Sequence, residues 1–167
     1  MADQEREDLI SMLAAQRALF QITVRGIDDQ QARQRTTASE LTLGGLLHHL
    51  ISCEGHWVTV LIERDENAVV ELSQFEGEYR MADGETVAGL LAEWDKVAAA
   101  TTELIRTVDS LDTSVPTPLA PWSPEREWWT VRYTLLHILR EISHHSGHAD
   151  IIREELDGAN TTLAQIS

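Results

Sequence analysis

Cysteine is almost absent from this sequence, with Cys53 the single one in 167 residues. An internal disulfide and a cysteine-rich zinc site are therefore excluded. Positive charge is also scarce, since 13 basic residues stand against 28 acidic ones and leave a net charge of −15. Nucleic acids and anionic membranes are bound through clustered cations, so we expect neither as a partner.

Long apolar runs are absent as well. No stretch approaches the roughly 20 apolar residues that a membrane span requires. The N-terminal segment MADQEREDLISML lacks the basic start and apolar run of a signal peptide. We therefore expect a cytoplasmic protein that does not cross a membrane.

Four stretches carry the apolar periodicity of an amphipathic α-helix. We predict helices over the following ranges: about 5–25, 42–63, 85–108 and 130–157. Strand-like alternation is not sustained anywhere in the sequence. Four amphipathic helices of this length predict an all-α fold, a four-helix bundle that forms one domain over residues 1–167.

The segments between these stretches predict long connections instead of tight hairpins. Residues 64–84 are polar and contain two glycines. All four prolines lie within residues 116–124, a segment through which no helix can continue. We also expect a short helical turn at 28–34 and an end to the last helix at Gly158.

The seven histidines occur in only two of the four predicted helices. The second helix carries the first three and the fourth helix the others: His48, His49, His56, His137, His144, His145 and His148. Helix bundles build metal sites from inward-pointing side chains on facing helices. This distribution predicts a site between the second and fourth helices.

A helical wheel indicates which of these side chains point inward. At ~100° per residue, His49 lies at the edge of the apolar arc, whereas His48 points roughly 100° away from it. Glu141 and His145 share one face because they are one turn apart. Two imidazoles and one carboxylate suit Zn²⁺ or a similar divalent ion and leave one coordination position open. Three ligands favour catalysis or ligand binding over a closed structural site.

Other interpretations of the histidines stay open. A histidine at the edge of an apolar face often caps the core and bonds to a backbone carbonyl without any metal. His144 and His148 form another pair at i, i+4 spacing and are the rival ligands, although both point further toward solvent. His137 lies one turn before Glu141, where it either supports a ligand or packs.

Two segments of the sequence resemble a known family. LTLGGLLHHLISCEGHW and TVRYTLLHILREISHHSGHADIIREELDG are similar to the DinB-like, YfiT-like metalloenzyme superfamily, and more closely to its mycothiol-dependent branch. The resemblance implies a four-helix bundle with one divalent metal, commonly zinc or nickel, held by three side chains of the second and fourth helices. In the mycothiol-dependent branch the first residue of the fourth-helix pair is glutamate. Glu141, His145 and His49 stand at the three positions.

The resemblance also implies thiol chemistry. Relatives join a low-molecular-weight thiol, such as mycothiol or bacillithiol, to an electrophile, and one relative is a mycothiol-dependent maleylpyruvate isomerase with an additional C-terminal domain. We therefore expect a metal-dependent thiol S-transferase, with zinc favoured over nickel and a thiol as cosubstrate. A metal-dependent hydrolase and a non-enzymatic metal- or ligand-binding stress-response module are the alternatives.

Several other residues carry predictions. His56 and His148 are candidates for a catalytic base or for contact with the thiol. We interpret Cys53 as a buried, small apolar residue in preference to a ligand or nucleophile. The segment after the prolines contains tryptophans that either line a substrate pocket or fill the end of the bundle: Trp122, Trp128 and Trp129.

The fourth helix also carries two structural predictions. Asp150 and Arg153 are one turn apart, and we expect them to pair. Gly147 costs about 1 kcal/mol relative to alanine in a helix, which indicates a close approach of backbone or ligand. Exposed faces of bundles often pair, so the sequence also allows a homodimer.

Overall fold

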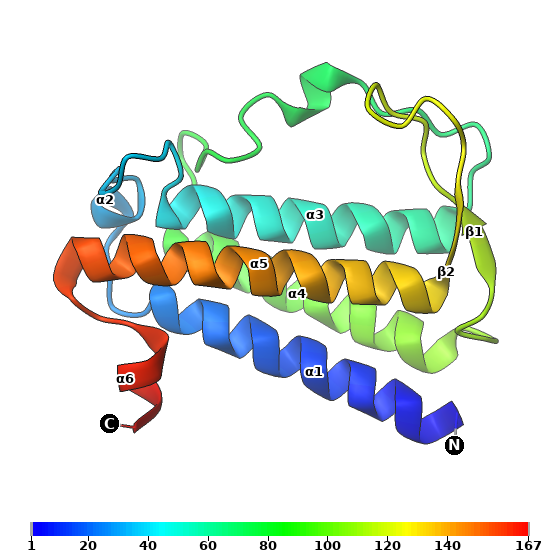
Figure 1. Ribbon diagram of the computed structural model, residues 1–167, viewed down its shortest axis with the longest axis horizontal. Helices are drawn as coiled ribbons and strands as arrows, with labels where there is room; N and C mark the ends of the chain where they lie inside the picture. The colour runs from blue at the N-terminus through cyan, green and yellow to red at the C-terminus, as the bar shows by residue number, and fades with distance from the viewer. Residues whose placement is uncertain (1, 167) are drawn as a thin grey trace.

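The computed structural model describes residues 2–166, so Met1 and Ser167, which the predicted domain includes, lie outside the described residues. Four long helices make up most of the chain, as Figure 1 shows. Their bounds are α1 Ala2–Thr23, α3 Leu43–Glu63, α4 Val87–Thr107 and α5 Val131–Asp157. The predicted all-α fold and four-helix bundle are confirmed.

Threonines determine where three of the helices begin. The side chains of Thr42, Thr86 and Thr130 each accept a hydrogen bond from the backbone N–H three residues ahead. At the other end of α5, Gly158 adopts the left-handed conformation, with φ 81°, and its N–H bonds to the carbonyl of Glu154. These local signals explain why the predicted bounds of α3, α4 and α5 agree with the observed ones to within two residues.

The four helices are arranged so that each contacts two others. α1 packs against α5 and α4, and α3 packs against α4 and α5. In Figure 1, α3 and α4 run in the same direction, opposite to α1 and α5. The connection between α3 and α4 must therefore return along the bundle, and it crosses over α3.

The core holds an ion pair among its apolar side chains. Phe20 and Trp94 are fully buried and meet edge to face, with ring centroids 5.5 Å apart. Beside them the buried carboxylate of Glu54 accepts hydrogen bonds from Arg17 at 3.0 and 2.5 Å, from Trp94 Nε1 at 2.8 Å and from the Thr101 hydroxyl at 2.5 Å. These bonds offset the desolvation of both charges.

Several short elements join the helices. They are the following: α2 Asp29–Ala32, the 3₁₀ helix η1 Leu72–Phe75, β1 Ser114–Pro116, β2 Trp128–Thr130 and α6 Thr161–Ile166. The helical turn predicted at 28–34 is confirmed as α2, whereas η1, the two strands and α6 were not predicted. β1 and β2 pair antiparallel, with Val115 opposite Trp129. None of the helices within residues 2–166 is both long and apolar enough to cross a membrane.

Two connections lie over the same side of the bundle, next to α3 and α5 (Figure 1). They are residues 64–86, between α3 and α4, and residues 117–127, between the strands. Val69 and Leu119 form a parallel bridge, with Val70 N–H bonding to Leu119 O at 2.7 Å and Leu119 N–H bonding to Ala68 O at 3.0 Å. The two connections are therefore held to each other above the helices.

The structure contradicts one prediction for α5 and the backbone half of another. Arg153 pairs with Asp157 at 2.8 Å and donates to the carbonyls of Thr23 and Arg25, while Asp150 accepts hydrogen bonds from Thr161. The end of α1 and the segment after α5 thus provide partners that spacing within one helix does not reveal. Apart from its chain neighbours and the nearby backbone of its own helix, no atom of the described residues lies within 4 Å of where a Cβ on Gly147 would be, so no other backbone approaches this glycine closely. The ligand alternative stays a prediction.

Candidate metal centre and adjoining cavity

Helices α3 and α5 bring His49, Glu141 and His145 together. One ligand atom of each residue lies within 4.8 Å of those of the other two. The imidazole centroids of His49 and His145 are 4.8 Å apart, and Glu141 Oε2 is 3.7 Å from His145 Nε2. Both histidines are buried, with 7% and 6% of their surface exposed. The three residues that the wheel selects therefore form one cluster.

His49 has one ring nitrogen engaged and one without a partner. Its Nδ1 lies 3.2 Å from Oε1 of Glu78, in the connection between α3 and α4. Burial alone would raise the pKa of Glu78, but hydrogen bonds from His49 and Ser52 lower it below its ordinary value. Glu78 is therefore a carboxylate, and His49 donates its Nδ1 hydrogen to it. In a neutral imidazole with its hydrogen on Nδ1, the lone pair is on Nε2, and this atom is buried without a hydrogen bond.

His145 faces a different group with each ring nitrogen. Its Nε2 is on the side of Glu141, and its Nδ1 lies 3.2 Å from Nδ1 of His148. Burial, together with the nearby His49 and His144, lowers the pKa of His145 to about 4, against the smaller opposing effect of Glu141. The ring is therefore neutral at pH 7, which is the form that binds metals.

Glu141 also contacts residues of its own helix. Its Oε1 lies 3.4 Å from the Arg140 guanidinium and 3.8 Å from Nδ1 of His137. The same guanidinium donates to His137 Nδ1 at 2.6 Å. Burial lowers the pKa of His137, and Arg140 lowers it further. His137 is thus a neutral acceptor beside the carboxylate.

The rival histidines form a second cluster around the same imidazole. His144, His145 and His148 also present ligand atoms within 4.8 Å of one another, but His144 is exposed and His148 only half-buried. His48, predicted to point away from the trio, instead bonds through Nδ1 to Glu85 at 3.0 Å. The first cluster is the better enclosed of the two.

A cavity of about 830 Å³ adjoins the His49 and Glu141 end of the first cluster. It lies between α3, α5 and the two connections, whose residues line it together with those helices. Of the predicted tryptophans, Trp122 and Trp129 line it, whereas Trp128 does not and is 54% exposed. The pocket interpretation therefore holds for two of the three.

Cys53 and His56 line this cavity as well. Burial raises the pKa of Cys53 to about 12, and the carboxylates of Glu141 and Glu78 add to the effect. The thiol is protonated at neutral pH, which disfavours it as a nucleophile or a ligand. Burial lowers the pKa of His56, so this imidazole is neutral at pH 7. His148, the other candidate base, is not among the residues described as lining the cavity.

Two residues of the site escaped the sequence analysis. Glu78 bonds to His49, and the ring of Tyr79 stacks on the His49 imidazole with centroids 4.1 Å apart. Both lie in the connection 64–86, which has no periodicity from which a facing direction can be read. Gly44 and Gly45, at the start of α3, are the signal that could have indicated that another segment packs closely against this helix. A Cβ on Gly45 would lie 2.1 Å from the Tyr79 carbonyl oxygen.

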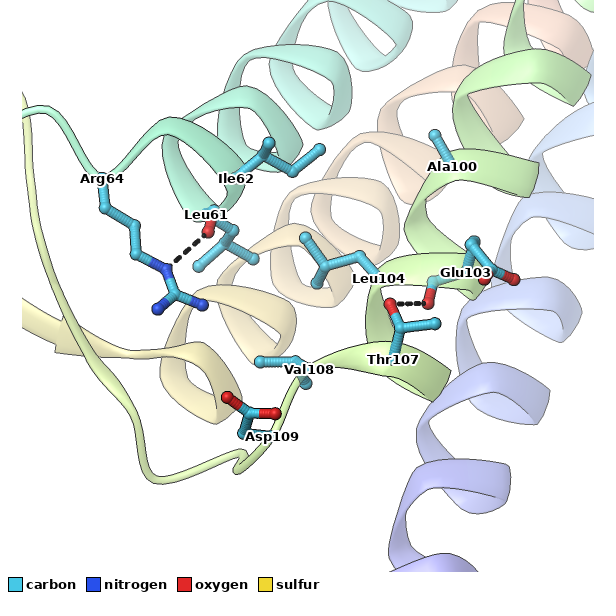
Figure 2. A pocket seen from close by; sticks show the side chains of 9 residues that line it. All are labelled: Leu61, Ile62, Arg64, Ala100, Glu103, Leu104, Thr107, Val108 and Asp109. Carbon is cyan, nitrogen blue, oxygen red and sulfur yellow. Dashed lines mark hydrogen bonds between the residues drawn. The ribbon is translucent and has the colours of Figure 1, made fainter.

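A second cavity, of about 400 Å³, lies at the opposite end of α3, between it and α4. Figure 2 shows that Arg64 donates to the carbonyl oxygen of Leu61 and Thr107 to that of Glu103 at its rim. None of its described lining residues is a histidine or cysteine. This cavity lacks the donor set of the first.

The donor set of the first cluster fits a divalent metal. A buried imidazole nitrogen without a hydrogen bond is costly unless something else occupies its lone pair. A second neutral imidazole and a carboxylate lie beside it, and a carboxylate behind His49 orients the ring, as in many metal sites.

Comparisons with known proteins address the fold and the family of the chain. The crystal structure of the conserved protein of locus from Enterococcus faecalis is similar, with a TM-score of 0.69 and 15% identity, over 92% of this chain and 97% of that one. At this identity the likeness supports the fold alone. A search of curated proteins finds no match. The family model for mycothiol-S-transferase matches residues 8–158, so the chain belongs to the mycothiol-S-transferase family.

Proposed function

We propose that this protein is a divalent-metal-dependent thiol S-transferase that joins a low-molecular-weight, mycothiol-like thiol to an electrophile. The observation that carries the proposal is the buried Nε2 of His49, which has no hydrogen bond and lies in a cluster with Glu141 and His145 beside a large cavity. Membership of the mycothiol-S-transferase family supports the thiol. Such thiols are kept reduced in the cytoplasm, which is where we place the protein.

The metal ligands in this proposal are His49, Glu141 and His145. Zinc is the ion we favour, with nickel second, because two imidazoles and a carboxylate suit either. These three residues would hold the ion, which would lower the pKa of a thiol bound to it and so provide a thiolate nucleophile at neutral pH. Glu78 holds the His49 proton on Nδ1, which leaves Nε2 for the ion.

The two candidate bases receive different roles. His148 faces Nδ1 of His145, so we assign it to orienting that ring by accepting the Nδ1 hydrogen. His56 is seven residues beyond His49 on α3, about 10 Å along the helix axis. That distance is too great for direct proton transfer from a thiol at the cluster, so we place His56 against the electrophile or its leaving group.

The overall reaction exchanges one bond of the thiol. The S–H bond breaks and releases a proton, and the electron pair left on sulfur forms an S–C bond to the electrophile. The bond between that carbon and its leaving group breaks, and the leaving group departs with the electrons of this bond. No side chain of the protein needs to form a covalent bond, which agrees with the protonated state of Cys53. The cavity holds the two substrates against each other and away from bulk water.

Metal content and thiol consumption test the proposal together. We expect the purified chain to hold one equivalent of zinc or nickel by elemental analysis and to consume mycothiol in the presence of an electrophile. The His49→Ala variant should lose both while its helical circular dichroism is retained. His48→Ala is the matched control and should keep both, because His48 bonds to Glu85 away from the trio.

The alternatives give different results. Turnover of an ester or amide without added thiol would favour a metal-dependent hydrolase. Bound metal with no turnover over a panel of thiols and electrophiles would favour a binding module. Full metal content in the His49→Ala variant would refute the ligand assignment itself.

A further inference from the structure

The cavity has two chemically different ends. His49, Glu78, Tyr79 and Glu141 lie at one end. The other end carries Trp57 of α3 and Trp129 of β2, which stack with centroids 4.9 Å apart and an angle of 16° between the ring planes.

The aromatic end is held in place by further rings. His137 meets Trp57 and Trp129 edge-on, with centroid distances of 5.1 and 5.3 Å. The Trp129 indole donates through Nε1 to the Glu127 carboxylate at 2.7 Å. A fixed aromatic surface of this kind binds flat, apolar molecules with little loss of side-chain entropy.

The charge lining the cavity is of one sign. Glu78, Glu127 and Glu141 line it, and no arginine or lysine is among its described lining residues. Two arginines outside the lining are bonded to residues that line it: Arg126 donates to the carbonyls of Thr117 and Ala68, and Arg140 donates to His137 and Glu141. The two positive charges of a divalent ion would balance the negative charges of Glu78 and Glu141. The negative charges of Glu127 and of the incoming thiolate would remain unbalanced.

We infer that the aromatic end, formed by Trp57, Trp129 and Glu127, is the binding site of the electrophile, and that it selects a flat aromatic compound without negative charge. The identification of this ligand as the electrophile rests on the proposed function, whereas the binding site itself does not. An anionic ligand there meets the carboxylate of Glu127, and no arginine or lysine is among the described lining residues to compensate. Like charges about 4 Å apart in water repel by roughly 1 kcal/mol, which corresponds to about a fivefold loss of affinity.

Equilibrium dialysis of two ligands of the same shape tests the inference. 3,5-Dinitrobenzamide is neutral and 3,5-dinitrobenzoate is an anion, and neither carries a leaving group that a thiol would displace readily. The full chain is used after treatment with a chelator, so that the carboxylate cannot bind a metal. We expect the amide to bind at least about fivefold more tightly than the carboxylate. The Glu127→Gln variant should reduce this preference.

Two tryptophan variants locate the site. Trp57→Leu should weaken binding of the amide at least about tenfold through loss of the aromatic surface. Trp128→Leu is the matched control and should bind as the parent chain does, because Trp128 is exposed and outside the cavity. If Trp57→Leu fails to fold, as judged by circular dichroism, Trp129→Leu and Glu127→Gln carry the test.

Equal affinity for the amide and the carboxylate, or loss of binding in Trp128→Leu but not in Trp57→Leu, would overturn the inference. These measurements need neither metal nor thiol. A failure to consume thiol would therefore count against the transferase proposal and leave the assignment of the aromatic binding site standing. A failure of the binding test would count against the aromatic site and leave the transferase proposal standing.

Discussion

The hydrogen bond between Glu78 and His49 determines which nitrogen of the imidazole is available to a metal. A carboxylate at 3.2 Å from Nδ1 holds the proton there, which leaves the lone pair of the neutral ring on the buried Nε2. Partners of this kind orient the ring and raise its basicity, and their loss typically lowers metal affinity 10–100-fold. Glu78 is therefore as much a part of the proposed site as the ligand it supports.

Replacing Glu78 by glutamine tests this role. We expect Glu78→Gln to weaken zinc binding about 10–100-fold, because an amide no longer accepts the Nδ1 hydrogen as strongly. A competition titration with a chromogenic chelator measures the affinity. Glu85→Gln alters the equivalent partner of His48 and should leave zinc affinity unchanged. Unchanged affinity in Glu78→Gln would show that His49 is oriented by other means.

Side chains on the long helices could be predicted from the sequence, and those in the connections could not. The spacing within a helix fixes which face a residue occupies, so the proximity of His49, Glu141 and His145 followed from periodicity and from the facing of two helices. Glu78 and Tyr79 lie in a connection whose path depends on tertiary packing. No repeating pattern in residues 64–86 indicates where either side chain points.

The connection 64–86 packs against the start of α3 at two glycines. A Cβ on Gly44 would lie 2.6 Å from Met81 Sδ, and one on Gly45 would lie 2.1 Å from the Tyr79 carbonyl oxygen. Backbone cannot move aside as a flexible side chain can. The absence of a side chain at Gly45 therefore allows the connection to bring Glu78 and Tyr79 over His49.

The Gly45→Ala variant tests this packing. Alanine in place of glycine inside a helix normally stabilises by about 1 kcal/mol. Here we expect the free energy of unfolding to fall by about 1–3 kcal/mol, because the added methyl group displaces the connection, and zinc affinity to fall with it. Urea denaturation and the chelator titration measure the two effects.

Gly147→Ala provides the control within α5. Outside its own stretch of helix, no atom of the described residues lies within 4 Å of its Cβ position, so this variant should gain up to about 1 kcal/mol in free energy of unfolding and keep its zinc affinity. Equal stabilisation by both substitutions would contradict the close approach at Gly45.

The helices and strands also divide into those that the sequence predicts and those that it does not. The four long helices were predictable because each has an apolar stripe, and α3, α4 and α5 add local signals, which are Thr42, Thr86, Thr130 and Gly158. β1 and β2 have three residues each and are stabilised by each other, across a connection of eleven residues. α6 has six residues and contacts α1, far away in the sequence. Such pairings leave no periodic signal in the segments concerned.

The site contains buried histidines that are neutral at pH 7, and their burial makes the stability of the bundle depend on pH. Burial lowers the pKa of His145 to about 4 from the ordinary value of 6.5, and it also lowers the pKa of His56 and His137. Each of these rings takes up a proton more readily in the unfolded chain than in the folded one.

The homodimer that the sequence allows stays a prediction.

The metal-free protein should therefore lose stability as the pH falls. Above about 6.5, His145 is neutral in both states and its contribution is fully present. Between 6.5 and about 4 the unfolded chain binds the additional proton, and the free energy of unfolding falls by up to about 3 kcal/mol. Urea denaturation at pH 7.5 and 4.5 in the presence of a chelator measures this change. The His145→Gln variant should show a smaller loss, and an identical loss would contradict the assignment.

Diffraction at the zinc absorption edge tests the central claim most directly. Crystals grown with zinc should give one strong anomalous peak between α3 and α5, within bonding distance of His49 Nε2, a Glu141 oxygen and His145 Nε2. A peak located only on the exposed His144 and His148, or no peak at full zinc occupancy in solution, would contradict the proposed metal centre.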